Sequence, residues 1–272
     1  MPSVFWALGA LAVGLPPLLA AAVASGPLTR SRLESFARLH RLPVTVDNGN
    51  QVIRYLAVTR RWRCAGLGAG AAVWVALNLP EQRVGVSSFA LFSGWFAGAL
   101  AAELHLARTV RGLRRSASLR PRTPGDYVRP HVWWLPVIGT AALAVPWAYA
   151  AVLHAFGRAA GWPLGPGTIG GLLVLGGAVL IRRRILWRPQ PPAAADVVRA
   201  DDAIRSRSLH VLSAAAFVLA VFCAAGDLAG VTSGMDRLDG DVAGITFLVG
   251  VTATLVGVLS ANARPPLRVV DA

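Results

Sequence analysis

The residues of this sequence best suited to chemistry are two acids, Glu103 and Asp227, which fall inside strongly apolar segments. A charge inside a bilayer costs at least about 2.5–3.5 kcal/mol on insertion scales, so each acid is a functional candidate. Glu103 lies about one helical turn from Arg108, which lets it reach the membrane surface or pair with an arginine of an inner loop. Asp227 stands among Gly226 and Gly230 without an arginine within a turn, and therefore needs a partner from another segment, a water or a cation. We expect Asp227 to matter more than Glu103.

Other groups that could bind a metal or act in catalysis are scattered along the chain. His105 follows Glu103 by two residues, which places the two side chains on different sides of a helix. An acidic stretch contains Asp236, Asp239 and Asp241 without the ligand order of an EF-hand, and a weak cation site there is the alternative to a solvated loop. The two cysteines match no metal or disulfide pattern. We therefore expect no metal, no cofactor and no enzymatic activity.

The composition is typical of a membrane protein. Of the 272 residues, 55% are hydrophobic and 15% charged, against roughly 45–50% and 25% in soluble domains. Apart from Glu103 and Asp227, the charges lie between seven apolar segments, most of which are long enough to cross about 30 Å of hydrocarbon as helices. This predicts an all-α polytopic membrane helix bundle, forming a single integral membrane domain over residues 1–272. The predicted spans are residues 3–24, 64–79, 84–107, 132–156, 165–181, 208–231 and 242–261.

The basic residues determine the predicted orientation. All 27 are arginines, and the net charge is +14. Twenty-four of them lie in the C-terminal tail and in the loops 25–63, 108–131 and 182–207, whereas the three other loops hold one each. Because arginine-rich loops stay on the cytoplasmic side, the N-terminus is expected outside and the C-terminus inside. The location would be a bacterial cytoplasmic membrane. This pattern accounts for the charge without a nucleic-acid partner, and it places the two intramembrane acids in opposite halves of the bilayer.

The segment 132–156 divides the predicted bundle into a 3+1+3 arrangement, and Pro136 and Pro146 should kink it. The same outline occurs in microbial rhodopsins and in small sugar transporters. A rhodopsin needs a lysine for its retinal Schiff base, and this chain has none. The sugar transporters carry a Pro-Gln pair within their spans, whereas Pro189 and Gln190 fall in a loop. No family is therefore assigned, and a true internal repeat remains an open alternative.

Three pairs of glycines four residues apart occur in the second, third and sixth predicted spans. Small residues at this spacing let two helices approach closely, and such packing drives helix association in lipid. We expect these glycines to pack helices within the chain, with homodimerisation through one face as the alternative. The pairs are Gly66 and Gly70, Gly94 and Gly98, and Gly226 and Gly230.

The first arginine-rich loop is predicted to contain a helix over residues 31–42. Ser31 and Glu34 fit a capping box, and Leu33, Phe36 and Leu39 form an apolar stripe. One hypothesis is an interfacial helix attracted to anionic lipid of the inner leaflet. The alternatives are that the stripe packs beneath the bundle or binds a protein partner.

The third arginine-rich loop is expected to be helical over residues 193–207. Asp201 and Arg205 are spaced as an i,i+4 pair within it. On an exposed helix such a pair contributes about 0.3 kcal/mol.

These features favour two function classes. The first is a small permease or an accessory subunit of a membrane transport system. The kinked central span favours this class. The second is a non-catalytic membrane scaffold that binds a protein partner or anionic lipid through its arginine-rich cytoplasmic loops.

Overall fold

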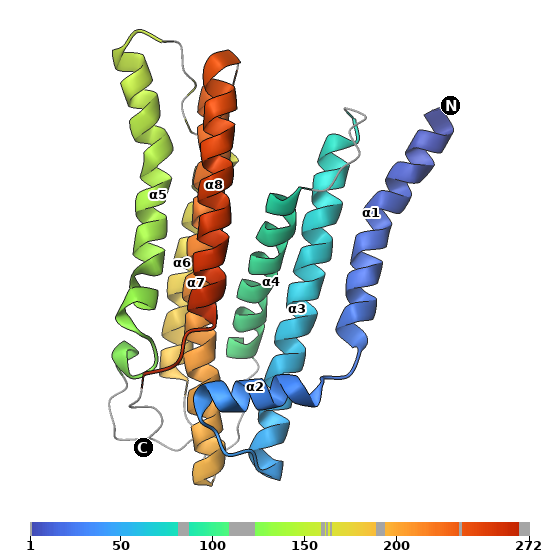
Figure 1. The fold of residues 1–272 in the computed structure, drawn as a ribbon, viewed down its shortest axis with the longest axis vertical. Coiled ribbons are helices and arrows are strands. Elements are labelled where there is room, and N and C mark those ends of the chain that lie inside the picture. Colours follow the sequence, from blue (N-terminus) through green and yellow to red (C-terminus); the bar gives the residue numbers. More distant parts are fainter. Residues whose placement is uncertain are drawn as a thin grey trace. The chain divides into compact units, whose positions relative to one another are not determined.

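The computed structural model describes residues 2–80, 87–108, 123–158, 161, 163, 165–188, 194–233 and 236–266, with only the backbone for 2–10, 12 and 236–240. These residues form eight α-helices and one 3-10 turn, so the all-α prediction is confirmed (Figure 1). The helices are α1 (Pro2–Ser25), α2 (Arg30–His40), α3 (Val46–Asn78), α4 (Ser88–Arg108), α5 (Pro130–Ala155), α6 (Pro166–Trp187), α7 (Ala195–Thr232) and α8 (Asp236–Ala261).

Among the described residues, four helices are long and apolar enough to cross a membrane: α4, α5, α7 and the part of α8 from Asp241 to Ala261. The other three predicted spans coincide with α1, with the second half of α3 and with most of α6. The number of seven spans stays a prediction. Much of the predicted loop 108–131 and residues 189–193 of the loop 182–207 lie outside the described residues, as do the side chains of Asp236 and Asp239.

The chain divides into two compact units. Unit 1 comprises residues 1–128, 184–209 and 264–272, and unit 2 comprises residues 129–183 and 210–263. Helix α7 contributes its first part to unit 1 and the rest to unit 2. It begins 13 residues before the predicted span, because the helix expected in the loop 182–207 continues into that span without a break.

In unit 1, helices α1, α3 and α4 lie side by side, and α2 runs across α3 (Figure 1). The glycines allow α3 and α4 to touch backbone to backbone. A Cβ atom built on Gly66 would lie 2.2 Å from the carbonyl oxygen of Gly94, and one built on Gly98 would lie 2.3 Å from that of Trp62. Gly70 faces Ala90 equally closely. Any side chain at these positions would push the two helices apart.

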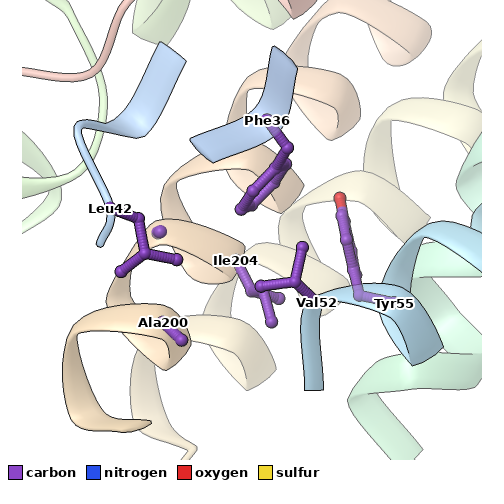
Figure 2. Packing of buried hydrophobic residues seen from close by; sticks show 7 residues of the cluster. Phe36, Leu42, Val52, Tyr55, Ala200 and Ile204 are labelled. Carbon is purple, nitrogen blue, oxygen red and sulfur yellow. The ribbon is translucent and has the colours of Figure 1, made fainter. Parts of the chain in front are cut away.

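The apolar side of α2 is covered by protein within unit 1. Phe36 and Leu42 are buried with residues from α3 and from the first part of α7, and Leu33 packs against this cluster. Figure 2 shows the side chains converging from the three segments. The arrangement is that of a helix packed beneath a bundle, and attraction to anionic lipid stays a prediction. The other members of the cluster are Val52, Tyr55, Ala200, Ala203 and Ile204.

The starts of α2 and α3 show how the local sequence sets these helices. The predicted capping box at Ser31 is wrong: α2 begins at Arg30 after Thr29, and Glu34 pairs with Arg30 instead. A capping box forms instead at Thr45, whose hydroxyl accepts a bond from the backbone N–H of Asn48, while the Asn48 side chain accepts one from the N–H of Thr45. It lets α3 start well before the predicted span.

Unit 2 contains α5, α8, α6 up to Arg183 and the second part of α7. Small residues bring its helices together: Gly139 of α5 lies against Ala220 of α7, and Gly171 of α6 lies against Leu143 of α5. Ala150, Leu153 and Val231 form a second buried cluster between α5 and α7. The two prolines that were expected to kink the segment 132–156, Pro136 and Pro146, lie inside α5, which is one continuous helix.

Candidate functional site

The charged and polar residues of unit 1 gather around the segments that bury α2. We use the name α2 layer for helix α2, residues 46–59 of α3, residues 195–209 of α7, and residues 184–188, which are the last turn of α6 and the following Arg188. All of them belong to unit 1. The layer combines the apolar cluster described above with three sets of polar contacts and an exposed set of arginines.

The first buried contact of the α2 layer is an ion-pair network around Asp201. One of its carboxylate oxygens accepts a bond from Nε of Arg205 at 2.7 Å, and the other accepts one from Nη2 of Arg188. Arg205 also donates from Nη1 to the carbonyl oxygen of Ile185 at 3.0 Å. The Arg205 side chain is only 1% exposed and that of Asp201 4%. The predicted i,i+4 pair is therefore confirmed, and it is part of a buried network that ties α6 to α7.

The second contact involves Glu103, which is 1% exposed. The hydroxyl of Tyr55 donates a hydrogen bond to its Oε1 at 3.1 Å. Ser208, Arg63 and Arg207 lie close enough to act on the carboxylate electrostatically. Burial raises the pKa of Tyr55 above its usual range, and the nearby Glu103 carboxylate adds to this, so the hydroxyl keeps its proton and remains a donor. Glu103 thus links α4 to α3 instead of reaching the surface beside Arg108.

The third contact attaches the loop before α5 to the α2 layer. The hydroxyl of Tyr127 donates to Asp202 at 3.0 Å, and the hydroxyl of Ser206 donates to the carbonyl oxygen of Tyr127 at 2.7 Å. At the other edge, the Thr45 hydroxyl donates to Asp196 at 2.6 Å, joining the start of α3 to the start of α7. Side chains from distant parts of the sequence therefore hold the layer together.

The α2 layer, with the adjoining residues of unit 1, carries many exposed arginines. Glu34 is the described acid that pairs with this set, through Arg30 at 2.8 Å and Arg38 at 4.0 Å. Both arginine side chains in these pairs are mostly exposed, so the pairs leave the positive charge accessible. The exposed arginines are Arg30, Arg32, Arg38, Arg41, Arg54, Arg61, Arg184 and Arg199.

In unit 2, Asp227 is also buried, and its partners come from α6. Its Oδ1 accepts the backbone N–H of Gly167 at 3.1 Å, and its Oδ2 accepts the hydroxyl of Thr168 at 2.5 Å. The indole N–H of Trp147 donates to the same hydroxyl oxygen at 3.2 Å. A carboxylate at the first turn of a helix satisfies free N–H groups and meets the positive end of the helix dipole. The expected partner from another segment is therefore the start of α6. The greater importance of Asp227 relative to Glu103 stays a prediction.

The remaining candidates do not join either group. A Cβ atom built on Gly226 or Gly230 would meet nothing within 4 Å, so this glycine pair lacks the close contact made by the pairs in α3 and α4. His105 is exposed, with its ring 5.8 Å from that of Trp62. Within the described part of the chain, no group of three His, Cys, Asp or Glu side chains could hold a metal ion.

Several residues of these contacts carry no signal that sequence reasoning could use. Tyr55 lies 48 residues before Glu103, and Thr168 lies 59 residues before Asp227. A hydroxyl residue has no particular spacing to its acid when the two stand on different helices. Only the i,i+4 spacing of Asp201 and Arg205 pointed to a real contact.

The chain matches no protein-family model, no curated protein and no solved structure.

Proposed function

We propose that the chain crosses a cytoplasmic membrane seven times, with its N-terminus outside and its C-terminus inside. Support comes from the helices, since each predicted span coincides with one, and from the arginines, 24 of which fall on one side in this arrangement. The α2 layer then lies at the cytoplasmic surface. Helix α7, at about 1.5 Å per residue, is about 57 Å long and reaches well beyond a hydrocarbon core of about 30 Å.

Reporter fusions test this topology. A fusion after Gly125 or Gln190 is expected to give a cytoplasmic signal, and one after Gly234 an exterior signal. These expectations follow from the arginine distribution. The loops that contain Gly125 and Gln190 are rich in arginine, whereas the loop that contains Gly234 holds one. An exterior signal from Gly125 would contradict the proposed orientation.

We further propose that the protein is a non-catalytic accessory subunit of a membrane assembly, such as a transport system, and that the α2 layer docks its partner. The observation that carries this proposal is the combination of a rigid base and an exposed charged surface. Phe36 of the α2 stripe is buried, Leu33 packs against the same cluster, and the carboxylate of Asp201 is paired with two arginines, so these contacts fix the shape of the layer. The arginines on its outside are left to contact an acidic surface of a cytoplasmic or membrane protein.

A permease is the second candidate. It is favoured by the polar cluster of the buried Asp227 with the half-buried Thr168 and Trp147, which lies within the proposed spans of unit 2. A buried acid inside a span is typical of an ion or substrate pathway.

Photo-crosslinking in intact cells tests the docking proposal. A photoreactive residue placed at Ser35, which is exposed on α2 between Arg32 and Arg38, is expected to capture one discrete protein. The double charge reversal Arg32→Glu and Arg38→Glu should lower that yield about tenfold, because like charges now face each other across the contact.

The matched control places the same photoreactive residue at Ile169, which is 61% exposed on α6 within a proposed span. It should capture lipid and not that protein. Capture of lipid alone from Ser35, or a yield unchanged by the charge reversal, would contradict docking through the α2 layer.

A further inference from the structure

Arg182, at the end of the span proposed for α6, is held in an unusual way for an arginine. Its Nη2 donates to the carbonyl oxygen of Trp133 and to the hydroxyl of Ser213, both at 3.2 Å. The guanidinium carbon lies 3.5 Å from the centre of the Trp133 ring, which is a close cation–π contact. All three residues belong to unit 2. The guanidinium group is therefore held at its Nη2 edge by two hydrogen bonds and on one face by the Trp133 ring.

The positive charge of Arg182 has no acidic partner among the residues that the structure describes. Both hydrogen bonds use Nη2, and Nε and Nη1 make none with the described chain. Burial lowers the pKa of Arg182 to about 10, which still leaves it charged at neutral pH. A half-buried cation held without a counter-ion favours an anion that supplies one.

The surroundings indicate the kind of anion. Arg182 follows directly on the apolar segment 165–181, so in the proposed topology it lies at the cytoplasmic headgroup level. Trp134, next to the stacking tryptophan, is 57% exposed, as tryptophans in the interfacial belt of a membrane are. A guanidinium presents parallel N–H groups that match the oxygens of a phosphate.

We propose that Arg182, stacked on Trp133 and anchored to Ser213, binds the headgroup phosphate of an anionic phospholipid in the cytoplasmic leaflet. Nε and Nη1 donate to two phosphate oxygens, while Nη2 keeps its bonds to the protein. The assignment to the cytoplasmic leaflet rests on the proposed topology. Reporter fusions that reversed the orientation would move the site to the other leaflet and leave the binding measurement below unaffected.

The test is thermal unfolding of the purified full chain in a neutral glycosidic detergent, with phosphatidylglycerol added in increasing amounts. The unfolding temperature is expected to rise to saturation for the unchanged protein. Arg182→Gln should raise the lipid concentration at half-effect at least tenfold. Arg183→Gln, which removes an adjacent exposed arginine, should leave that concentration within about twofold.

Two further titrations separate the sources of phosphate. Phosphatidylcholine and inorganic phosphate are each expected to give less than a third of the rise produced by phosphatidylglycerol. An equal rise with inorganic phosphate would overturn the lipid assignment, and equal half-effect concentrations for the two glutamine variants would overturn the site.

Arg182→Gln also removes two bonds between helices, so it could fail to fold. Arg182→Lys then decides the matter, because it keeps the charge and loses the flat fork that grips two oxygens. Its half-effect concentration should lie severalfold above that of the unchanged protein. A concentration equal to that of the unchanged protein would overturn binding through the guanidinium.

Discussion

Gly94→Ala is expected to lower the free energy of unfolding of unit 1 by about 3 kcal/mol, at the upper end of what overpacking costs. The added Cβ would lie 2.2 Å from the carbonyl oxygen of Gly66 and 3.0 Å from the Cα of Gly70. Both are backbone atoms, so α3 and α4 must separate, and the close packing that holds two helices together in lipid is lost. Unfolding in increasing sodium dodecyl sulfate, followed by circular dichroism, measures the change.

Gly226→Ala is the matched control, because it is the same substitution in a helical glycine of another four-residue pair. Its Cβ would meet nothing within 4 Å. Alanine is about 1 kcal/mol more favourable than glycine inside a helix, so stability should stay the same or rise by up to that amount. Equal losses in the two variants would show that the contact between α3 and α4 does not explain the effect at Gly94.

Asp201→Asn is expected to lower the free energy of unfolding by about 3–5 kcal/mol, the usual cost of removing one partner from a buried ion pair. Asparagine keeps the size of the side chain but removes the carboxylate charge that both Arg188 and Arg205 contact in this network. The same detergent titration measures the loss. The partner binding proposed for the α2 layer should fall with it, because the network joins α6 to α7 within that layer.

Glu34→Gln is the control for this second prediction, since it removes a carboxylate that also pairs with two arginines. Here the partners are exposed, with the Arg30 side chain 91% accessible. Pairs of this kind contribute about 0–1 kcal/mol, so the variant should unfold within about 1 kcal/mol of the unchanged protein. A loss at Asp201 as small as this would mean that the network does not stabilise the fold.

Helices were predictable from the sequence because a run of apolar residues between arginines has few other solutions in a membrane. Their ends were less predictable. The capping box at Thr45 starts α3 at Val46, and α7 continues the helix expected over residues 193–207 into the sixth predicted span without a break. Hydropathy marks where a helix enters lipid, whereas capping and packing decide where it begins.

Contacts between helices were mostly beyond the sequence. The spacing of Asp201 and Arg205 made them neighbours on α7. Their burial depends on Ile185 at the end of α6 and on the residues of α2 and α3 that pack against this part of α7. The glycine pairs named the right residue type, and only the structure shows that those of α3 and α4 face each other while Gly226 faces open space. Whether the surfaces of two helices fit each other cannot be read from the sequence of either helix alone.

The contact between Asp227 and the start of α6 has a consequence for the order in which the protein is made. Asp227 lies 60 residues after Gly167. At a synthesis rate of roughly 5–20 residues per second, the acid is added to the growing chain about 3–12 seconds after the helix end that it serves. During that interval the first N–H groups of α6 lack the carboxylate, so this end of the helix is completed only when α7 has been inserted beside it.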